Sequence, residues 1–379
     1  MHRVLVLGGG FGGIATAVAL RERLAADDEV VLVERRPTFV MGLRKNWALV
    51  GASTIAEGER PLSRLEDRGI RIHPGTVTAL DPAARAADVD GQRLEADALV
   101  VALGAQRHPD GIPGFREHAI DLYDVAASTA GAAAIDAFTG GRVVVGIFGA
   151  PYPCPPGPYE LALLLMERLE ARGIPGGMLV FTPQSGSLPI LGTDGCAAFD
   201  GRLANAGITF RPKTVAAAVE PGAVVTSDGV RLPYNLLLGV PPHRVPPVVE
   251  AAGLTGPSGW VAVDARTLET RFPGVYAIGD VTAIPIANGM ALPKAGVFAH
   301  REGEVVAARI ADALAGREPT ATFTGEGMCF LETGHGTAAA VEGDFFADPP
   351  AVTLSPDSAE NLARKHAFEG ERLTAWFGG

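Results

Sequence analysis

RVLVLGGGFGGIATAVALRERL, residues 3–24, predicts a strand, a tight glycine turn and a helix. The apolar run Val4 to Leu7 is typical of a buried strand, and the Ala-rich stretch after the turn is typical of a helix. Between them, Gly8, Gly10 and Gly13 have GxGxxG spacing. Gly8 permits the turn, Gly10 lets the backbone approach a pyrophosphate, and Gly13 lets helix and strand pack closely. Because the helix N-terminus also offers free amides and partial positive charge, the stretch predicts a dinucleotide-binding unit.

The next apolar run, Val30 to Val33, strengthens this prediction because it ends in an acidic residue. Glu34 follows the glycine loop by roughly 20 residues, where a carboxylate can accept hydrogen bonds from an adenosine ribose. We therefore take the loop and the residues at this strand end as candidates for cofactor binding: Gly8, Gly10, Phe11, Gly12, Gly13, Glu34 and Arg35.

Two later strands end in glycine and complete this part of the pattern. DALVVALGAQ (97–106) runs to Gly104, and RFPGVYAIGDVTA (271–283) runs to Gly279 and Asp280. An Asp at such a place is commonly just a helix N-cap. The Gly-Asp pair also resembles the FAD-closing motif of pyridine-nucleotide disulfide oxidoreductase-like flavoproteins, which implies that Asp280 bonds the ribityl chain. Both roles can hold together.

An internal repeat predicts the domain plan. The order of elements from Val4 to Gly104 recurs from Val143 to Gly239, with turn signals at Asp90-Gly91 and Asp228-Gly229. We expect an α/β fold with two Rossmann-like domains, the second inserted in the first, and a short C-terminal segment. The predicted boundaries are 1–115 with 255–325 for FAD binding, 116–254 for the inserted domain and 326–379 for the C-terminal segment.

Composition narrows the function. The chain has 379 residues, is 47% hydrophobic and carries a net charge of -11, which argues against nucleic acid. The first strand starts by residue 3 and no apolar run is long enough to cross a bilayer, so we expect a cytoplasmic protein without a transmembrane segment. Three cysteines in a reducing compartment are more typical of catalysis than of structural disulfides. No metal site is predicted.

The second glycine loop is replaced by GAPYPCPPGPYELALLL (149–165). Prolines lack the amide donors that a pyrophosphate needs, so dinucleotide binding is disfavoured there. Cys154 instead lies just ahead of a predicted helix near 158–172. Because a helix N-terminus favours a thiolate, we expect this position to lower the pKa of Cys154.

This motif, CPPGPYE (154–160), resembles the sulfide:quinone oxidoreductase and flavocytochrome c sulfide dehydrogenase group of flavoproteins. The resemblance extends through AIGDV, MALPKAGVFAHREGEVVA (290–307) and GEGMCFLETGHGTAAAVEGDFF (325–346). It implies that Cys329 pairs with Cys154 beside the flavin and that Phe330 contacts a quinone. It also implies that Glu160 moves protons and that Lys294 stabilises the reduced flavin ring.

Each of these residues also has a plainer interpretation. Buried cysteines are often small hydrophobes, and Cys196 matches no motif and is expected to be a packed thiol. Glu160 is also a first-turn acid favoured by the helix dipole, and Lys294 a helix-start lysine. His300 and His335 remain unassigned. Which cysteine faces the flavin, and whether the two meet in space, is open at this point.

Departures from the group set the remaining expectations. No cysteine lies in FVMGLRKNW (39–47), where flavocytochrome c tethers its flavin, so FAD is expected to be noncovalent. The third cysteine that many quinone reductases of the group carry before the proline-rich loop is also absent, since residues 105–153 contain no cysteine. The tail predicts one helix capped at Ser355, with an apolar stripe of Leu362, His366, Leu373, Trp376 and Phe377. Such a stripe is more typical of core than of a membrane anchor, although peripheral contact with the inner face of the membrane is compatible with it.

The resemblance implies an FAD-dependent oxidoreductase that oxidises sulfide, a persulfide or a thiol. Hydrosulfide would attack the Cys154–Cys329 disulfide, and electrons would pass through FAD to a quinone-like acceptor. One alternative is an NAD(P)H-dependent quinone or disulfide reductase, which the missing second GxGxxG disfavours. Another is a non-catalytic flavoprotein whose redox state controls a partner. The oligomeric state is left open.

Overall fold

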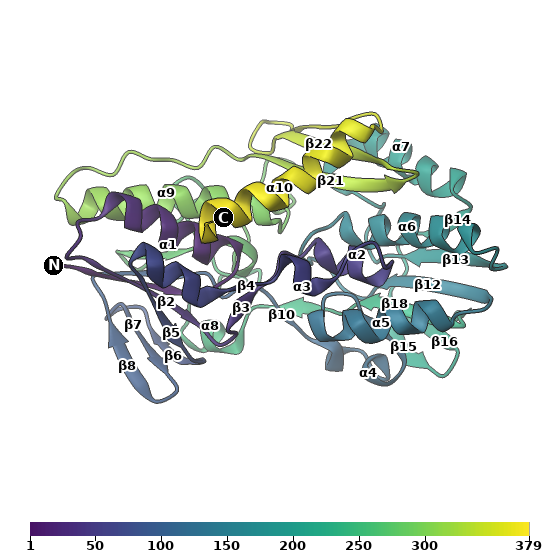
Figure 1. The fold of residues 1–379 in the computed structure, drawn as a ribbon, viewed down its shortest axis with the longest axis horizontal. Coiled ribbons are helices and arrows are strands. Elements are labelled where there is room, and N and C mark those ends of the chain that lie inside the picture. Colours follow the sequence, from purple (N-terminus) through teal and green to yellow (C-terminus); the bar gives the residue numbers. More distant parts are fainter. Residues whose placement is uncertain (379) are drawn as a thin grey trace.

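The computed structural model describes residues 1–378, and two five-stranded parallel sheets form its framework. The first sheet has the order β20-β9-β1-β2-β5 and the second the order β11-β18-β12-β13-β14. The first comprises β1 (Arg3–Leu7), β2 (Glu29–Glu34), β5 (Ile70–Pro74), β9 (Ala98–Val101) and β20 (Val275–Ala277). The second comprises β11 (Ile120–Asp121), β12 (Gly141–Ile147), β13 (Gly176–Phe181), β14 (Ile208–Arg211) and β18 (Leu236–Val240). Figure 1 shows the two sheets side by side along the long axis of the molecule.

The predicted repeat extends to a small antiparallel sheet in each half. One consists of β6 (Val77–Asp81), β7 (Ala86–Val89) and β8 (Gln92–Glu95), the other of β15 (Ala216–Glu220), β16 (Ala223–Thr226) and β17 (Arg231–Pro233). At the predicted turn between β7 and β8, Asp90 and Gly91 have φ values of 46° and 88°, as a two-residue hairpin turn requires. The predicted α/β fold with two Rossmann-like units is therefore confirmed.

Helices cover the sheets, and β20 returns to the first sheet after the second has been completed. The helices are α1 (Phe11–Arg23), α2 (Arg44–Leu49), α3 (Ile55–Gly58), α4 (Phe115–His118), α5 (Val125–Ala137), α6 (Gly157–Ala171), α7 (Gly192–Asn205), α8 (Pro247–Ala251), α9 (Gly296–Leu314) and α10 (Ala359–Phe377). Two short pairs, β3 (Thr38–Phe39) with β4 (Arg60–Pro61) and β10 (Gln106–Arg107) with β19 (His243–Arg244), complete the connections. The exact domain boundaries given above remain a prediction.

The C-terminal segment forms a third layer that joins both halves. Strands β21 (Glu326–Gly334), β22 (Thr337–Asp344) and β23 (Ala351–Leu354) form an antiparallel sheet, and β21 packs against α6. In Figure 1, α10 runs from this sheet towards α1, with which it is in contact. Within residues 1–378, no helix is both long and apolar enough to span a bilayer.

The start of α10 differs from the prediction. Its N-cap is Ser358, whose hydroxyl accepts a hydrogen bond from the Asn361 amide at 3.1 Å, and not Ser355. The Ser355 hydroxyl is instead used in tertiary contacts, because it accepts hydrogen bonds from the Ala340 amide and the Asn361 side chain. Leu373, Trp376 and Phe377 of the predicted stripe are buried in the core, whereas His366 is exposed.

Candidate active site

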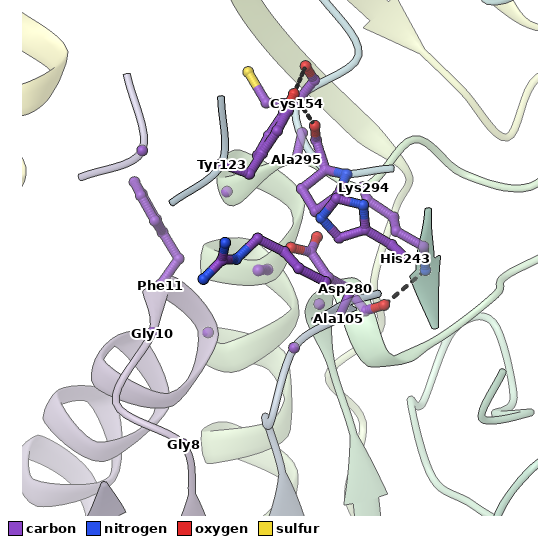
Figure 2. A pocket seen from close by; sticks show the side chains of 18 of the residues that line it. Gly8, Gly10, Phe11, Ala105, Tyr123, Cys154, His243, Asp280, Lys294 and Ala295 are labelled. Atoms are coloured by element: carbon purple, nitrogen blue, oxygen red, sulfur yellow. Dashed lines mark hydrogen bonds between the residues drawn. The ribbon is translucent and has the colours of Figure 1, made fainter. Parts of the chain in front are cut away.

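A single cavity of about 930 Å³ connects the glycine loop after β1 with the loop that carries Cys154. Figure 2 shows Gly8 and Gly10 at one end, Cys154 and Tyr123 at the other, and Asp280 between them. All predicted site residues except Gly13 line it: Gly8, Gly10, Phe11, Gly12, Glu34, Arg35, Gly104, Cys154, Glu160, Asp280, Lys294, Cys329 and Phe330. Its size is typical of a cavity for a cofactor or other large ligand.

The glycine loop has the shape that a pyrophosphate needs. Gly8 has a φ of 108°, and a Cβ there would lie 2.3 Å from the Ala102 carbonyl oxygen. A Cβ on Gly13 would lie 1.8 Å from the Gly8 carbonyl oxygen, so Gly13 serves helix packing behind the cavity. Nothing lies within 4 Å of a Cβ at Gly10, which faces open space at the N-terminus of α1. Residues 8–13 therefore fit a bound dinucleotide.

Glu34 is held ionised at the end of β2. Its carboxylate accepts hydrogen bonds from the Gly9 amide at 2.8 Å and from the Arg36 amide and guanidinium. Although burial alone would raise it, these bonds lower the pKa of Glu34. The arginine that pairs with Glu34 is thus Arg36, and both Arg36 and the predicted Arg35 line the cavity. An ionised carboxylate here can accept hydrogen bonds from ribose hydroxyls.

Asp280 and the start of α9 form the central wall of the cavity. Burial raises the pKa of Asp280, against the opposing charges of Lys294 and Lys45. Ala295, Gly296 and Val297 also line the cavity at the α9 N-terminus, which has no side-chain cap. Free amides and the helix dipole at this end would stabilise a negatively charged ring.

The Lys294 amine is committed to the backbone. It donates hydrogen bonds of 2.7 Å to the carbonyl oxygens of Asp280 and Thr282 and lies 3.5 Å above the Trp260 ring. Burial lowers the pKa of Lys294 to about 8. The Lys294 side chain therefore stabilises the turn after β20, and its positive charge lies at the cavity wall beside that turn.

Cys154 sits in a tightly held loop. It has a φ of 50°, its amide donates to the Lys294 carbonyl at 2.6 Å, and its carbonyl accepts a 3.1 Å bond from the Tyr123 hydroxyl. The residue is exposed and lines the cavity. Burial, with the Glu160 carboxylate, raises the pKa of Cys154 to about 11. The expected lowering is wrong, because desolvation outweighs the nearby helix N-terminus.

Cys329 reaches the same cavity from β21. Burial raises the pKa of Cys329 to about 12, and Cys329 and Cys154 line the same cavity. Both are free thiols, as is Cys196, which lies outside the cavity near Ser187. Packing of β21 on α6 thus brings together two cysteines that are far apart in sequence.

A buried charged cluster lies directly behind the cysteines. Glu160 on α6 accepts hydrogen bonds from the Asn46 side chain, the Glu332 amide and Lys365, the last at 2.7 Å. Lys365 also pairs with Glu332 at 2.8 Å. Although burial alone would lower it, Glu160 and Glu332 raise the pKa of Lys365. Glu160 and Lys365 both line the cavity, so a proton held between them can reach it.

Aromatic side chains form the wall beyond Cys329. Phe330 on β21 meets Phe368 on α10 edge to face at 6.4 Å, and Phe368 stacks on Phe11 at 6.3 Å. All three line the cavity. Such a wall suits a flat, apolar ring system.

Sequence reasoning missed Lys365, Glu332 and Asn46. A signal for Lys365 was present, since Asn361, Lys365 and Glu369 continue the buried stripe of Leu373 and Phe377 at four-residue spacing. Polar residues on a buried face are expected to have partners, but the sequence does not name them.

The duplicated parallel sheets and the shared cavity define the class, an α/β protein with two dinucleotide-binding-type units. The chain belongs to the pyridine nucleotide-disulphide oxidoreductase family, whose model matches residues 2–146 and 188–303.

Comparison with individual proteins shows which members of this family the chain resembles. The chain is 24% identical to the mitochondrial sulfide:quinone oxidoreductase of Mus musculus, covering 95% of this chain and 82% of that protein. It is 26% identical to the sulfide-quinone reductase of Aquifex aeolicus, covering 91% and 83%. The crystal structure of the sulfide:quinone oxidoreductase of Aquifex aeolicus matches with a TM-score of 0.90 at 24% identity, over all of this chain and 92% of that one. The predicted resemblance to this group is confirmed, and the chain is an FAD-dependent oxidoreductase.

Proposed function

We propose that this protein oxidises sulfide, or the sulfur of a persulfide or thiol, with a Cys154–Cys329 disulfide, and delivers the electrons to a quinone-like acceptor. The observation that carries the proposal is that both cysteines line the cavity that also holds the residues suited to FAD. The names of the relatives in mouse and Aquifex support the choice of donor and acceptor.

The chemistry at the cysteines is thiol–disulfide exchange. In the oxidised protein, hydrosulfide attacks one cysteine sulfur, a new sulfur–sulfur bond forms, and the Cys154–Cys329 bond breaks. The electron pair of the broken bond leaves on the second cysteine as a thiolate. The sulfide sulfur is thereby oxidised and the disulfide reduced. Bound FAD supplies a two-electron carrier between the reduced cysteine and the acceptor.

The residues around the cysteines support separate parts of this reaction. Gly8, Gly10, Glu34 and Asp280 would hold FAD noncovalently, since the cysteines that line the cavity are the two assigned to sulfur chemistry. Glu160 and Lys365 can hold and move a proton at the cavity wall, as reduction of a quinone requires. Phe330 and Phe368 offer rings against which a quinone can stack.

The location follows from the acceptor and remains part of the proposal. A lipid-soluble quinone is reached at a membrane surface, so we expect peripheral membrane contact.

Anaerobic reduction tests the function directly. The yellow protein is mixed separately with sulfide, NADH and NADPH, and flavin bleaching is followed in wild type, Cys154→Ser, Cys329→Ser and the control Cys196→Ser. We expect fast bleaching by sulfide in wild type and Cys196→Ser, and loss of bleaching in the other two variants. Fast bleaching by a nicotinamide that does not depend on Cys154 would overturn the proposal in favour of a reductase.

A further inference from the structure

Lys45, the second residue of α2, brings a cation to the cavity without a carboxylate partner. Its ammonium lies 4.7 Å from the centre of the Tyr123 ring and 3.5 Å from the Tyr123 carbonyl oxygen. Among residues 1–378, no Asp or Glu oxygen is within ion-pair distance of it. Lys45 is half-buried, and a partly desolvated ammonium with only a ring and one long carbonyl contact gains from pairing with an anion.

Tyr123 places this cation next to Cys154. Its hydroxyl donates to the carbonyl oxygens of Pro153 at 2.6 Å and Cys154 at 3.1 Å. Figure 2 shows the Tyr123 ring beside Cys154 at the upper end of the cavity. Lys45 and the Cys154 loop therefore contact the same aromatic side chain.

The other cations of this region are already used. Lys365 is paired with Glu160 and Glu332, Lys294 with two carbonyl oxygens, and Arg107 with Asp121 and Asp124. Burial lowers the pKa of His243 to about 4, so its ring is neutral. Lys45 is thus left as the uncommitted positive charge beside Cys154. Lys365 and Lys45 are the two cations that oppose the raised pKa of that thiol.

We propose that Lys45 binds the sulfur donor as an anion, hydrosulfide, next to Cys154, and then pairs with the negative sulfur that the exchange leaves there. This assignment rests on the proposed function. Disulfide attack spreads one negative charge over three sulfur atoms, and a fixed cation in a poorly solvated cavity stabilises that charge. Lys45 therefore selects an anionic sulfur nucleophile over a neutral thiol.

The surroundings of Lys45 set the pH range of this effect. Burial lowers the pKa of Lys45 to about 8; Cys154, Asp121 and Asp280 act to raise it and Arg107 to lower it. Tyr123 and His243 face the same space as neutral groups. The cation is therefore present below about pH 8 and lost above it.

The first test measures sulfide dependence of anaerobic flavin bleaching at pH 7 in Lys45→Gln, Lys45→Arg and the exposed control Lys213→Gln. We expect the half-saturating sulfide concentration to rise roughly tenfold in Lys45→Gln, and to stay close to wild type in Lys45→Arg and Lys213→Gln. Bleaching of wild type with an unchanged sulfide dependence in Lys45→Gln would overturn the role of Lys45 alone. No bleaching of wild type would overturn the proposed function and, with it, the hydrosulfide assignment.

The second test reads the charge at Cys154 without any flavin reaction. Cys196→Ser/Cys329→Ser protein is reduced, and alkylation of Cys154 by iodoacetamide is followed by intact mass between pH 6.5 and 9.5. Adding Lys45→Gln should slow alkylation roughly tenfold at pH 7, because the thiolate loses its cation, and the difference should shrink above pH 8. Equal alkylation rates across the pH range would show that Lys45 does not act on Cys154 and would overturn the proposal.

Discussion

Gly10 and Gly13 belong to one motif but face different surroundings. A Cβ at Gly13 would collide with the Gly8 carbonyl oxygen, whereas a Cβ at Gly10 would enter open space in the cavity. Gly13 is therefore required by the packing of α1 on β1, and Gly10 by the ligand. This separation cannot be read from the spacing alone, because both positions satisfy GxGxxG.

We expect Gly13→Ala to destabilise the fold, by about 2 kcal/mol or more, because backbone must move. Gly10→Ala should lower the free energy of unfolding of the FAD-free protein by no more than about 1 kcal/mol, the cost of alanine at the α1 N-cap, and weaken FAD binding. Urea unfolding of the FAD-free proteins and FAD titration followed by fluorescence check both. Equal stability losses in the two variants would contradict the assignment.

Lys365 is the residue on which the buried charged cluster depends. With 3% of its surface exposed, it neutralises one of the two carboxylates of Glu160 and Glu332. Removing it leaves buried, uncompensated negative charge. The two carboxylates raise the pKa of Lys365. The stabilisation that its charge provides is therefore present throughout the neutral pH range, and it is lost only when the pH rises above the pKa of a free lysine.

We therefore expect Lys365→Met to lower the free energy of unfolding at pH 7 by about 3–5 kcal/mol. Urea unfolding measures this, with Lys213→Met as the matched control because Lys213 is an exposed lysine outside the cavity. A loss as small as that of the control would mean that the cluster contributes little to stability.

At the scale of elements, α9 controls the turn that follows β20. Glu302 of α9 is buried and accepts a 2.6 Å hydrogen bond from the Gly279 amide, one residue before Asp280. Gly279 has a φ of 70°, so the turn depends on this glycine and on the bond that holds it. The helix thus positions Asp280 from behind the cavity.

Glu302 should also make stability depend on pH. Burial raises the pKa of Glu302 to about 7, from 4.5 for a free carboxyl. Between these values the folded state holds a proton that the unfolded state has released, so the free energy of unfolding falls as the pH rises.

Glu302→Gln keeps an acceptor for Gly279 but cannot ionise. We expect it to be more stable than wild type at pH 8, by roughly 1–3 kcal/mol, with the difference vanishing near pH 4.5. Urea unfolding at several pH values measures the difference, and Glu318→Gln, at an exposed position just after the same helix, is the control. Parallel pH profiles of wild type and Glu302→Gln would refute this role.

At the scale of the whole molecule, the cavity exists only because three parts of the chain close around it. The first sheet supplies the glycine loop, the loop before α6 supplies Cys154, α6 supplies Glu160, and the C-terminal layer supplies Cys329 and Lys365. The proposed donor region then contains Lys45 and Tyr123, and the proposed acceptor region contains Phe330 of β21 and Phe368 of α10.

This division predicts separable half-reactions. We expect Phe368→Ala to leave flavin bleaching by sulfide within about twofold of wild type and to slow reoxidation by a soluble quinone roughly tenfold, through loss of a stacking surface. Anaerobic stopped-flow measurement of each half-reaction tests this, with Glu371→Ala, exposed on α10, as the control. Equal slowing of both half-reactions would argue against a separate acceptor site.

The sequence by itself determined the local features of this protein. The period of the apolar runs, the GxGxxG spacing and the Asp-Gly turns predicted β1, α1 and the paired hairpins, because these elements depend on neighbours in the chain. The loop around Cys154 could also be recognised from the sequence, since its prolines lack the backbone amides that a second pyrophosphate site would need. These signals sufficed for the fold class and for the glycine loop, Glu34 and Cys154, whereas the roles of Glu160, Lys294, Cys329 and Phe330 came from the resemblance to a known family.

Only the tertiary structure decided how the distant parts meet. The shared cavity of Cys154 and Cys329 and the pairing of Lys365 with Glu160 and Glu332 arise where β21 packs on α6 and α10 packs on β21. The cap of α10 is Ser358 because Ser355 bonds another strand, and the pKa of Cys154 is raised because its surroundings in the folded chain, with the Glu160 carboxylate, disfavour the thiolate. Burial and long-range pairing depend on the whole packed chain, so the order of residues along it does not reveal them.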